Sequence, residues 1–362
     1  MICKESLFSY ESIKTLKKQY CAPEVDILLI ALNRYGVCAD MPDKRLRFKL
    51  SPLQSDEVFY LAVCVNTFDS PFYIRENGFL YLNDIKVGQI FDIEQDTCDA
   101  SYFRRNKTEL TLNSNMRSQC KGCTFCGTYR LNPEDRVDMS DDDKIATFVE
   151  DYLEKNHVSD LSNLNRVTLC TGCFEDEMKL VEHINAIYRV FGKYGFNKRI
   201  HYIGSQLRSE EAMKAIEESI PYFSLSLTIE CFSNRETRMR KEKASLNLNT
   251  IQDILFRSLK HNFSTKYLYI VGLDNLDTMR HGIEKLENSV NRIPLFQVMQ
   301  NYVEEHENQR VSEAKSITYY LEARKMIETI FKDREFKPRS WENYRGLFYT
   351  SYQDEDLKCI RI

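Results

Sequence analysis

"RVTLCTGCFEDEMKLVEHINAIYRVFGKYG" (residues 166–195) joins a short apolar run to a long amphipathic segment. The run 166–170 has the length of a buried strand, whereas the apolar residues of 177–195 recur at the spacing of one helical face. This pairing occurs six times along the chain, so the sequence predicts parallel strands joined by right-handed helical crossovers. The expected strands are 109–113, 166–170, 198–204, 222–230, 265–272 and 294–300.

Six strand-helix units are compatible with two α/β architectures, an open doubly wound sheet and a partial barrel. Periodicity alone does not separate the two. In both architectures, ligands bind in the loops that follow the carboxyl ends of the strands. We therefore expect the functional residues directly after the predicted strands.

The beginning of the chain has a different pattern. A helix-like segment at 11–20 is followed by several short runs rich in aromatic and β-branched residues, which predict a small, mostly antiparallel module. The expected organisation is a helix plus β-rich module over 1–108, the α/β unit over 109–335, and a tail or lid over 336–362 that packs on this unit.

The composition is that of an ordered globular protein, with 43% hydrophobic residues, 21 Phe and 21 Tyr. The net charge of −4 gives no basic field for nucleic acid or an anionic membrane. Charges interrupt the first twenty residues where a signal peptide would be apolar, and the apolar run 25–32 is too short to cross a bilayer. We expect a cytoplasmic protein whose 12 cysteines are mostly reduced, so that clustered cysteines indicate metal or redox chemistry.

One cysteine cluster follows the first expected strand of the α/β unit. In "NSNMRSQCKGCTFCGTYR" (113–130), Cys120, Cys123 and Cys126 stand two residues apart. Three thiolates on a short loop can hold three corners of a [4Fe–4S] cluster and leave its fourth iron open to a small molecule. The alternative is a structural zinc site, which needs a fourth ligand such as Cys170, Cys173 or a histidine.

The cluster and its position resemble the radical S-adenosylmethionine (SAM) superfamily, and the resemblance extends from residue 109 to the end of the sixth unit. This family folds as a partial (βα)6 barrel with three cluster cysteines after its first strand. Its usual pattern is C-x3-C-x-aromatic-C, and Phe125 matches the aromatic residue that packs near the SAM adenine. Lys121 and Gly122 give two residues where three are usual, so the subfamily is not assigned beyond a loose similarity to biotin synthase and hydrogenase maturases.

The resemblance implies further SAM-binding residues after the later strands. In "TGCFED" (171–176), Gly172 and Glu175 correspond loosely to the segment that holds the SAM amino group; Glu175 is also typical of a first helical turn. The other implied residues are Glu230 as a strand-end acid, Arg238 or its rival Arg240 as the partner of the SAM carboxylate, and Val271 with Gly272 behind the adenine. The stretch "RETRMRKEK" is equally typical of a solvated helix start.

The implied activity is reductive cleavage of SAM to a 5′-deoxyadenosyl radical, which abstracts hydrogen from a small metabolite, an amino acid or a peptide. The implied electron donor is flavodoxin or ferredoxin. Methyl or aminocarboxypropyl transfer from SAM is an alternative, and a zinc-stapled α/β binding protein without radical chemistry is another. Cys170 and Cys173 are candidates for a second metal or for contact with substrate. The candidate substrate-facing residues are Gln297, Gln300, Tyr302, His306, Trp341, Tyr344 and Arg345.

Overall fold

A computed structural model describes residues 8–41, 45–65, 70–75, 78–95, 102–114, 123–126 and 139–357. Its larger sheet has seven strands in the order β12-β11-β10-β9-β8-β7-β6. The strands from β7 to β12 are parallel, and β6 pairs antiparallel with β7. The strand bounds are β6 Tyr102–Arg104, β7 Glu109–Leu112, β8 Arg166–Cys170, β9 Arg199–Gly204, β10 Phe223–Glu230, β11 Ser264–Val271 and β12 Leu295–Val298.

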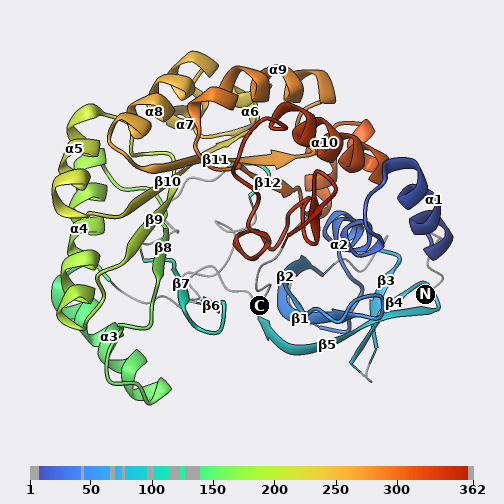
Figure 1. Ribbon diagram of the computed structural model, residues 1–362, viewed down its shortest axis with the longest axis horizontal. Helices are drawn as coiled ribbons and strands as arrows, with labels where there is room; N and C mark the ends of the chain where they lie inside the picture. Colours follow the sequence, from blue (N-terminus) through green and yellow to red (C-terminus); the bar gives the residue numbers. More distant parts are fainter. Residues whose placement is uncertain are drawn as a thin grey trace.

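The order of the parallel strands decides between the two predicted architectures. Each parallel strand lies beside the next one along the chain, so the strand order never reverses as it does in a doubly wound sheet. The sheet is curled, and its helices lie on the outer face (Figure 1). The prediction of a partial (βα)6 barrel is therefore confirmed.

Helices connect or follow the barrel strands, and several begin at side chains that cap their first turn. Asp141, Asp176, Ser209, Asn247 and Asn275 each accept a hydrogen bond from the backbone N–H three residues later. These capping hydrogen bonds fix the end of each loop that runs from the carboxyl end of a strand to the following helix. The helices are α3 Asp142–Asn156, α4 Glu177–Lys193, α5 Glu210–Ser219, α6 Arg235–Arg238, α7 Lys241–Ala244, α8 Leu248–Lys260, α9 Leu276–Leu286 and α10 Ile317–Ile330.

The first part of the chain forms the expected antiparallel module. Its sheet has the order β2-β1-β5-β4-β3, and each neighbouring pair is antiparallel. The pairing of β6 with β7 places 102–104 on the barrel sheet, and the expected boundary after residue 108 stays a prediction. The elements are α1 Tyr10–Tyr20, α2 Glu24–Tyr35, β1 Arg45–Pro52, β2 Phe59–Cys64, β3 Phe72–Ile74, β4 Phe79–Leu82 and β5 Ile85–Gln95.

The C-terminal segment lies between the barrel and the antiparallel module (Figure 1). It pairs with the edge of the barrel, where the backbone N–H of Val298 donates to the carbonyl of Arg345 at 2.7 Å. Within the described residues, no helix is long and apolar enough to cross a membrane. The short elements of this segment are η7 Ser340–Glu342, β13 Ser351–Tyr352 and β14 Glu355–Asp356. Three further 3-10 helices lie earlier in the chain, η4 Glu287–Ser289 before β12, and η5 Glu304–Gln309 and η6 Glu313–Lys315 between β12 and α10.

Candidate active site

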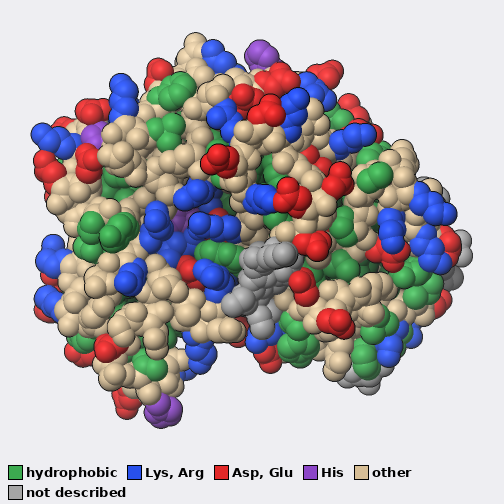
Figure 2. Space-filling view, in the orientation of Figure 1, with side chains coloured by type: hydrophobic (Ala, Val, Ile, Leu, Met, Phe, Trp, Pro, Cys, Tyr) green, Lys and Arg blue, Asp and Glu red, His purple; other side chains and the backbone are tan. Residues whose placement is uncertain are grey.

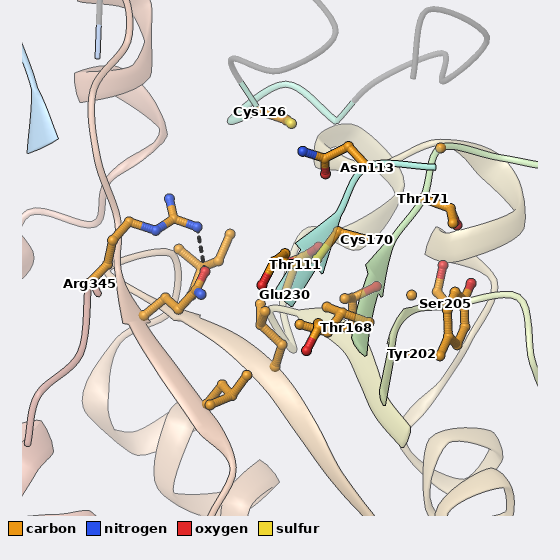
Figure 3. A pocket seen from close by; sticks show the side chains of 18 of the residues that line it. Thr111, Asn113, Cys126, Thr168, Cys170, Thr171, Tyr202, Ser205, Glu230 and Arg345 are labelled. Carbon is orange, nitrogen blue, oxygen red and sulfur yellow. Dashed lines mark hydrogen bonds between the residues drawn. The ribbon is translucent and has the colours of Figure 1, made fainter. Parts of the chain in front are cut away.

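A cavity of about 280 Å³ lies on the inner face of the barrel sheet. Because side chains alternate between the two faces of a strand, the lining residues of most barrel strands are two positions apart. Strand β9 differs, since its last four residues all line the space. The cavity is continued by residues of the antiparallel module and of the C-terminal segment. Figure 3 shows Cys126 and Asn113 at one end of the space, and Arg345 across it from Thr171 and Ser205. The residues of the parallel strands that line it are Thr111, Arg166, Thr168, Cys170, His201, Tyr202, Ile203, Gly204, Thr228, Glu230, Leu268, Ile270, Leu295 and Gln297.

The described part of the cysteine loop, residues 123–126, forms a short turn over this cavity. The backbone N–H of Cys126 donates to the carbonyl of Cys123 at 2.8 Å, which closes the turn. The N–H of Thr124 donates to the carbonyl of Arg238 at 2.8 Å and ties the turn to α6. Both cysteines line the cavity. Cys120 lies outside the described residues.

A small apolar cluster supports the cysteine turn. Phe125 is buried with Leu268 and Ile270 of β11, and Cys123 and Cys126 pack against this group. Burial raises the pKa of the Cys123 thiol to about 11. A thiol in this environment stays protonated at neutral pH unless a cation replaces its proton, as a bound metal does.

Glu230 occupies an irregular position at the end of β10. The pairing of β10 with β11 shifts register between Thr228 and Glu230, and Glu230 has a φ of 68°. A non-glycine residue in this left-handed region costs about 1–3 kcal/mol and occurs mainly where a side chain must be aimed. The Glu230 carboxylate lines the cavity and forms an ion pair with Lys243 of α7. The irregularity thus presents an acidic group, already paired with a cation, to the cavity.

The two candidate arginines lie in different environments. The Arg238 guanidinium is buried, donates to the carbonyls of Leu273 at 2.6 Å and Gln309 at 3.3 Å, and lies 3.8 Å from the carboxylate of Asp274. It does not line the cavity described here, whereas Arg240 does and donates a hydrogen bond to the sulfur of Cys173. The structure therefore places the Arg240 guanidinium beside Cys173 in the cavity. The Arg238 guanidinium is instead held by the loops that contain Leu273 and Gln309.

The segment after β8 divides between the cavity and the surface. Gly172 and Cys173 line the cavity together with Cys170. The side-chain amide of Gln206 holds this loop through two hydrogen bonds to the backbone of Phe174. It accepts from the Phe174 N–H at 2.9 Å and donates to the Phe174 carbonyl at 3.0 Å. Glu175 is exposed and lines a neighbouring surface pocket instead.

The two residues expected behind the adenine lie outside the cavity lining. Val271 is buried in the main core, and Gly272 has a φ of 124° and lies close to Met299. Ile270 faces the cavity instead, because neighbouring residues of a strand point to opposite sides. The sequence analysis missed Ile270, Asn113 and Lys243. The alternation of side chains between the two faces of β11 could have identified Ile270 as a residue that faces the cavity.

The candidate substrate-facing residues also separate in the structure. Gln297, Tyr302, Tyr344 and Arg345 line the cavity. Gln300 instead donates to the side chain of Asn33 at 2.9 Å and joins the barrel to α2. The remaining two, His306 and Trp341, are buried outside the cavity lining.

No group of three or more His, Cys, Asp or Glu side chains in the described part of the chain is arranged to hold a metal ion. Cys170 and Cys173 line the same cavity as Cys123 and Cys126. The cavity therefore has sulfur atoms from the carboxyl end of β8 and from the loop that follows β7. The donors present are soft thiols, the type that iron–sulfur clusters and zinc both use.

The similarities found to known proteins lie in structure rather than in sequence. No family model matches the chain, and no curated protein matches its sequence. Among solved structures, it is similar to HydG, a maturase of the [FeFe]-hydrogenase, with 15% identity and a TM-score of 0.41 over 61% of this chain and 49% of that one. It is also similar to anSMEcpe with bound AdoMet and Cp18Cys peptide, with 14% identity and a TM-score of 0.37 over 64% of this chain and 60% of that one.

The chain thus spans about half the length of HydG and three fifths of anSMEcpe. Structural likeness at this level carries no functional argument. The assignment of the fold rests on the parallel pairing and consecutive order of the barrel strands.

Proposed function

We propose that this chain is a radical SAM enzyme that binds a [4Fe–4S] cluster and SAM in the barrel cavity. The observation that carries the proposal is the position of the cysteine turn. Cys123 and Cys126 lie over the carboxyl ends of a consecutive parallel half-barrel and line the same cavity as Glu230. In parallel α/β folds this end of the strands is where cofactors bind.

The residues present fit an iron–sulfur cluster by their chemistry. Cys123 and Cys126 supply soft sulfur ligands, and Cys120 is proposed from the sequence as the third. Lys243, whose charge opposes the effect of burial on the pKa of Cys123, offsets the negative charge of a coordinated thiolate. When bound, the reduced cluster supplies the electron that cleaves SAM and generates a 5′-deoxyadenosyl radical.

The chain's own residues would bind and orient SAM. Arg240 is proposed to pair with the SAM carboxylate, because it lines the cavity, where its guanidinium donates to the sulfur of Cys173. Glu230 and Gly172 are proposed to face the polar part of SAM. Phe125 and Ile270 are proposed to pack near the adenine, and their apolar cluster keeps water from the reacting atoms.

Several finer points belong to the same proposal. The hydrogen donor is a small metabolite, an amino acid or a peptide, and the electron comes from flavodoxin or ferredoxin in the cytoplasm. Aminocarboxypropyl or methyl transfer would use the same cofactors and leave different nucleoside products. A zinc-stapled binding protein is the alternative outside this class.

The cluster is tested by metal analysis of anaerobically purified protein. We expect about four iron and four sulfide per chain, and loss of most of both in Cys123→Ala. Cys21→Ala is the matched control, because Cys21 lies exposed at the end of α1. Stoichiometric zinc without iron or sulfide would contradict the proposal, as would a Cys123→Ala protein that keeps its full iron content.

A further inference from the structure

Positive charge is in excess on the lining of the barrel cavity. Among the described lining residues, Glu230 and Glu342 are the carboxylates, and each is already engaged by a cation. Glu230 pairs with Lys243, and Glu342 accepts from Arg166 at 2.6 Å and also pairs with Lys266. Figure 2 shows blue side chains gathered around the hollow. The lining cations are Arg45, Arg47, Arg104, Arg166, Arg240, Lys243 and Arg345.

Four of these cations form one group with three tyrosines, which we call the arginine–tyrosine cluster. Arg45 Nη1 and Arg345 Nη1 donate to the hydroxyl of Tyr302 at 2.6 and 3.1 Å. Other members stack, with the Arg47 guanidinium carbon 3.6 Å from the ring centre of Tyr102. The cluster consists of Arg45, Arg47, Arg104, Arg345, Tyr102, Tyr302 and Tyr344, and the guanidinium of Arg104 lies 4.7 Å from the ring centre of Tyr344.

The elements that carry the cluster come from three parts of the chain. Arg45 and Arg47 lie on β1 of the antiparallel module, Arg104 lies on β6, and Arg345 lies in the C-terminal segment. Their alternate positions on β1 put both side chains of that strand on one face. The module therefore does more than cover the open side of the barrel, because it adds charge to the cavity.

The guanidinium groups of Arg104 and Arg345 retain unused hydrogen-bonding capacity. Arg104 is 7% exposed and donates to the carbonyl of Trp341, while its Nε and Nη2 atoms meet no acceptor among the described residues. Arg345 donates to Tyr302 and Gln297, while its Nε meets none. Neither residue forms an ion pair with a described carboxylate. Arg104 is buried and Arg345 is half-buried, and a cation in such a position without an anion is unfavourable. A bound anion would therefore stabilise this arrangement.

SAM does not account for this charge. It carries one carboxylate against a sulfonium and an ammonium group, and Arg240, which lies outside the cluster, suffices for that carboxylate. A set of arginine forks beside tyrosine hydroxyls is suited to an oxyanion, either planar or tetrahedral. We propose that the arginine–tyrosine cluster binds an oxyanion of the substrate, so that the substrate is a small metabolite with a carboxylate or phosphate group. Assigning this ligand as the substrate rests on the proposed function.

The subsite is tested by calorimetric titration of the full chain with two probes, inorganic phosphate and succinate, in a buffer of low ionic strength. We expect saturable binding of at least one probe to the wild-type protein. Arg345→Gln should weaken it by about tenfold or more, because a charge-assisted contact to the anion is lost. The matched control is Arg189→Gln on α4, whose ion pair with Asp142 is exposed and should leave the affinity unchanged.

Arg47→Gln is the second variant, from another element of the cluster, and it should weaken binding as well if Arg345→Gln does not fold. Preference for one probe over the other identifies phosphate or carboxylate as the group recognised. Absence of saturable binding of both probes, or equal affinity in both variants and the wild type, would overturn the subsite.

The titration needs neither SAM nor a reductant. It can therefore refute the anion site without refuting the radical SAM function, and the reverse also holds. Protein without iron that still binds phosphate or succinate through Arg345 would refute the radical SAM function and leave the anion site standing. Protein that holds the cluster and cleaves SAM but binds neither probe would refute the anion site alone.

Discussion

At the scale of single residues, similar side chains a few positions apart have different tasks. Arg238 is held by backbone carbonyls and by Asp274, whereas Arg240 reaches the cavity. The resemblance to radical SAM proteins ranked Arg238 first, and the geometry favours Arg240 as the partner of a carboxylate. Glu230 also differs from its neighbours, because its backbone is in the left-handed region, which an ordinary strand residue does not adopt.

The two arginines give a matched prediction. Arg240→Gln should weaken SAM binding by about tenfold with little change in the melting temperature, because a charge-assisted contact to the ligand is lost. Arg238→Gln should instead lower the melting temperature by several degrees, because buried carbonyls lose their donor and the buried Asp274 carboxylate loses a nearby cation. Equilibrium binding of SAM and thermal unfolding of both variants check this. Loss of SAM binding in a well-folded Arg238→Gln, with normal binding in Arg240→Gln, would reverse the assignment.

At the scale of elements, strand positions were largely predictable and side-chain directions were not. The run 166–170 coincides with β8, and the expected 222–230 differs from β10 by one residue. Buried parallel strands are recognisable because they are short apolar runs between turns and amphipathic helices. A difference of one residue decides which face of a strand a side chain occupies. The family resemblance implied Val271, whereas its neighbour Ile270 lines the cavity.

The strand order and the arginine–tyrosine cluster required the structure. Periodicity describes each strand separately, so it gives neither the neighbour of a strand nor the curl of the sheet. Arg45, Arg104 and Arg345 are distant in sequence and carry no shared motif. They meet because the antiparallel module and the C-terminal segment close the same side of the barrel.

At the scale of the whole molecule, a buried ion pair joins the beginning of the chain to its end. Asp26 of α2 pairs with Arg324 of α10, and it accepts from the backbone N–H groups of Tyr349 at 3.1 Å and Thr350 at 2.8 Å. The antiparallel module is thus attached to the last barrel helix and to the C-terminal segment. This attachment fixes the side of the cavity that carries Arg45 and Arg345.

The stability of the molecule should fall as the pH is lowered through the range of histidine titration. Burial lowers the pKa of His183 to about 4, from an ordinary value of 6.5, and burial also lowers the pKa of His201. Above pH 6.5 both groups are neutral in the folded and unfolded states. Below it the unfolded chain takes up the proton first, so His183 alone costs about 2 kcal/mol of stability between pH 8 and pH 5.

Thermal or urea unfolding at several pH values measures this effect. His183→Asn should flatten the dependence between pH 6.5 and 4, and His281→Asn on the exposed face of α9 should not. An unchanged pH dependence in His183→Asn would show that His183 does not titrate as described.

The central claim is tested most directly by the nucleoside that the protein makes from SAM. Anaerobic protein with its cluster is incubated with SAM and a strong reductant, and the products are separated by chromatography. We predict 5′-deoxyadenosine that depends on the reductant and is absent in Cys123→Ala. Methylthioadenosine or S-adenosylhomocysteine in its place would indicate aminocarboxypropyl or methyl transfer. Iron-loaded protein that leaves SAM intact under these conditions would contradict the radical SAM assignment.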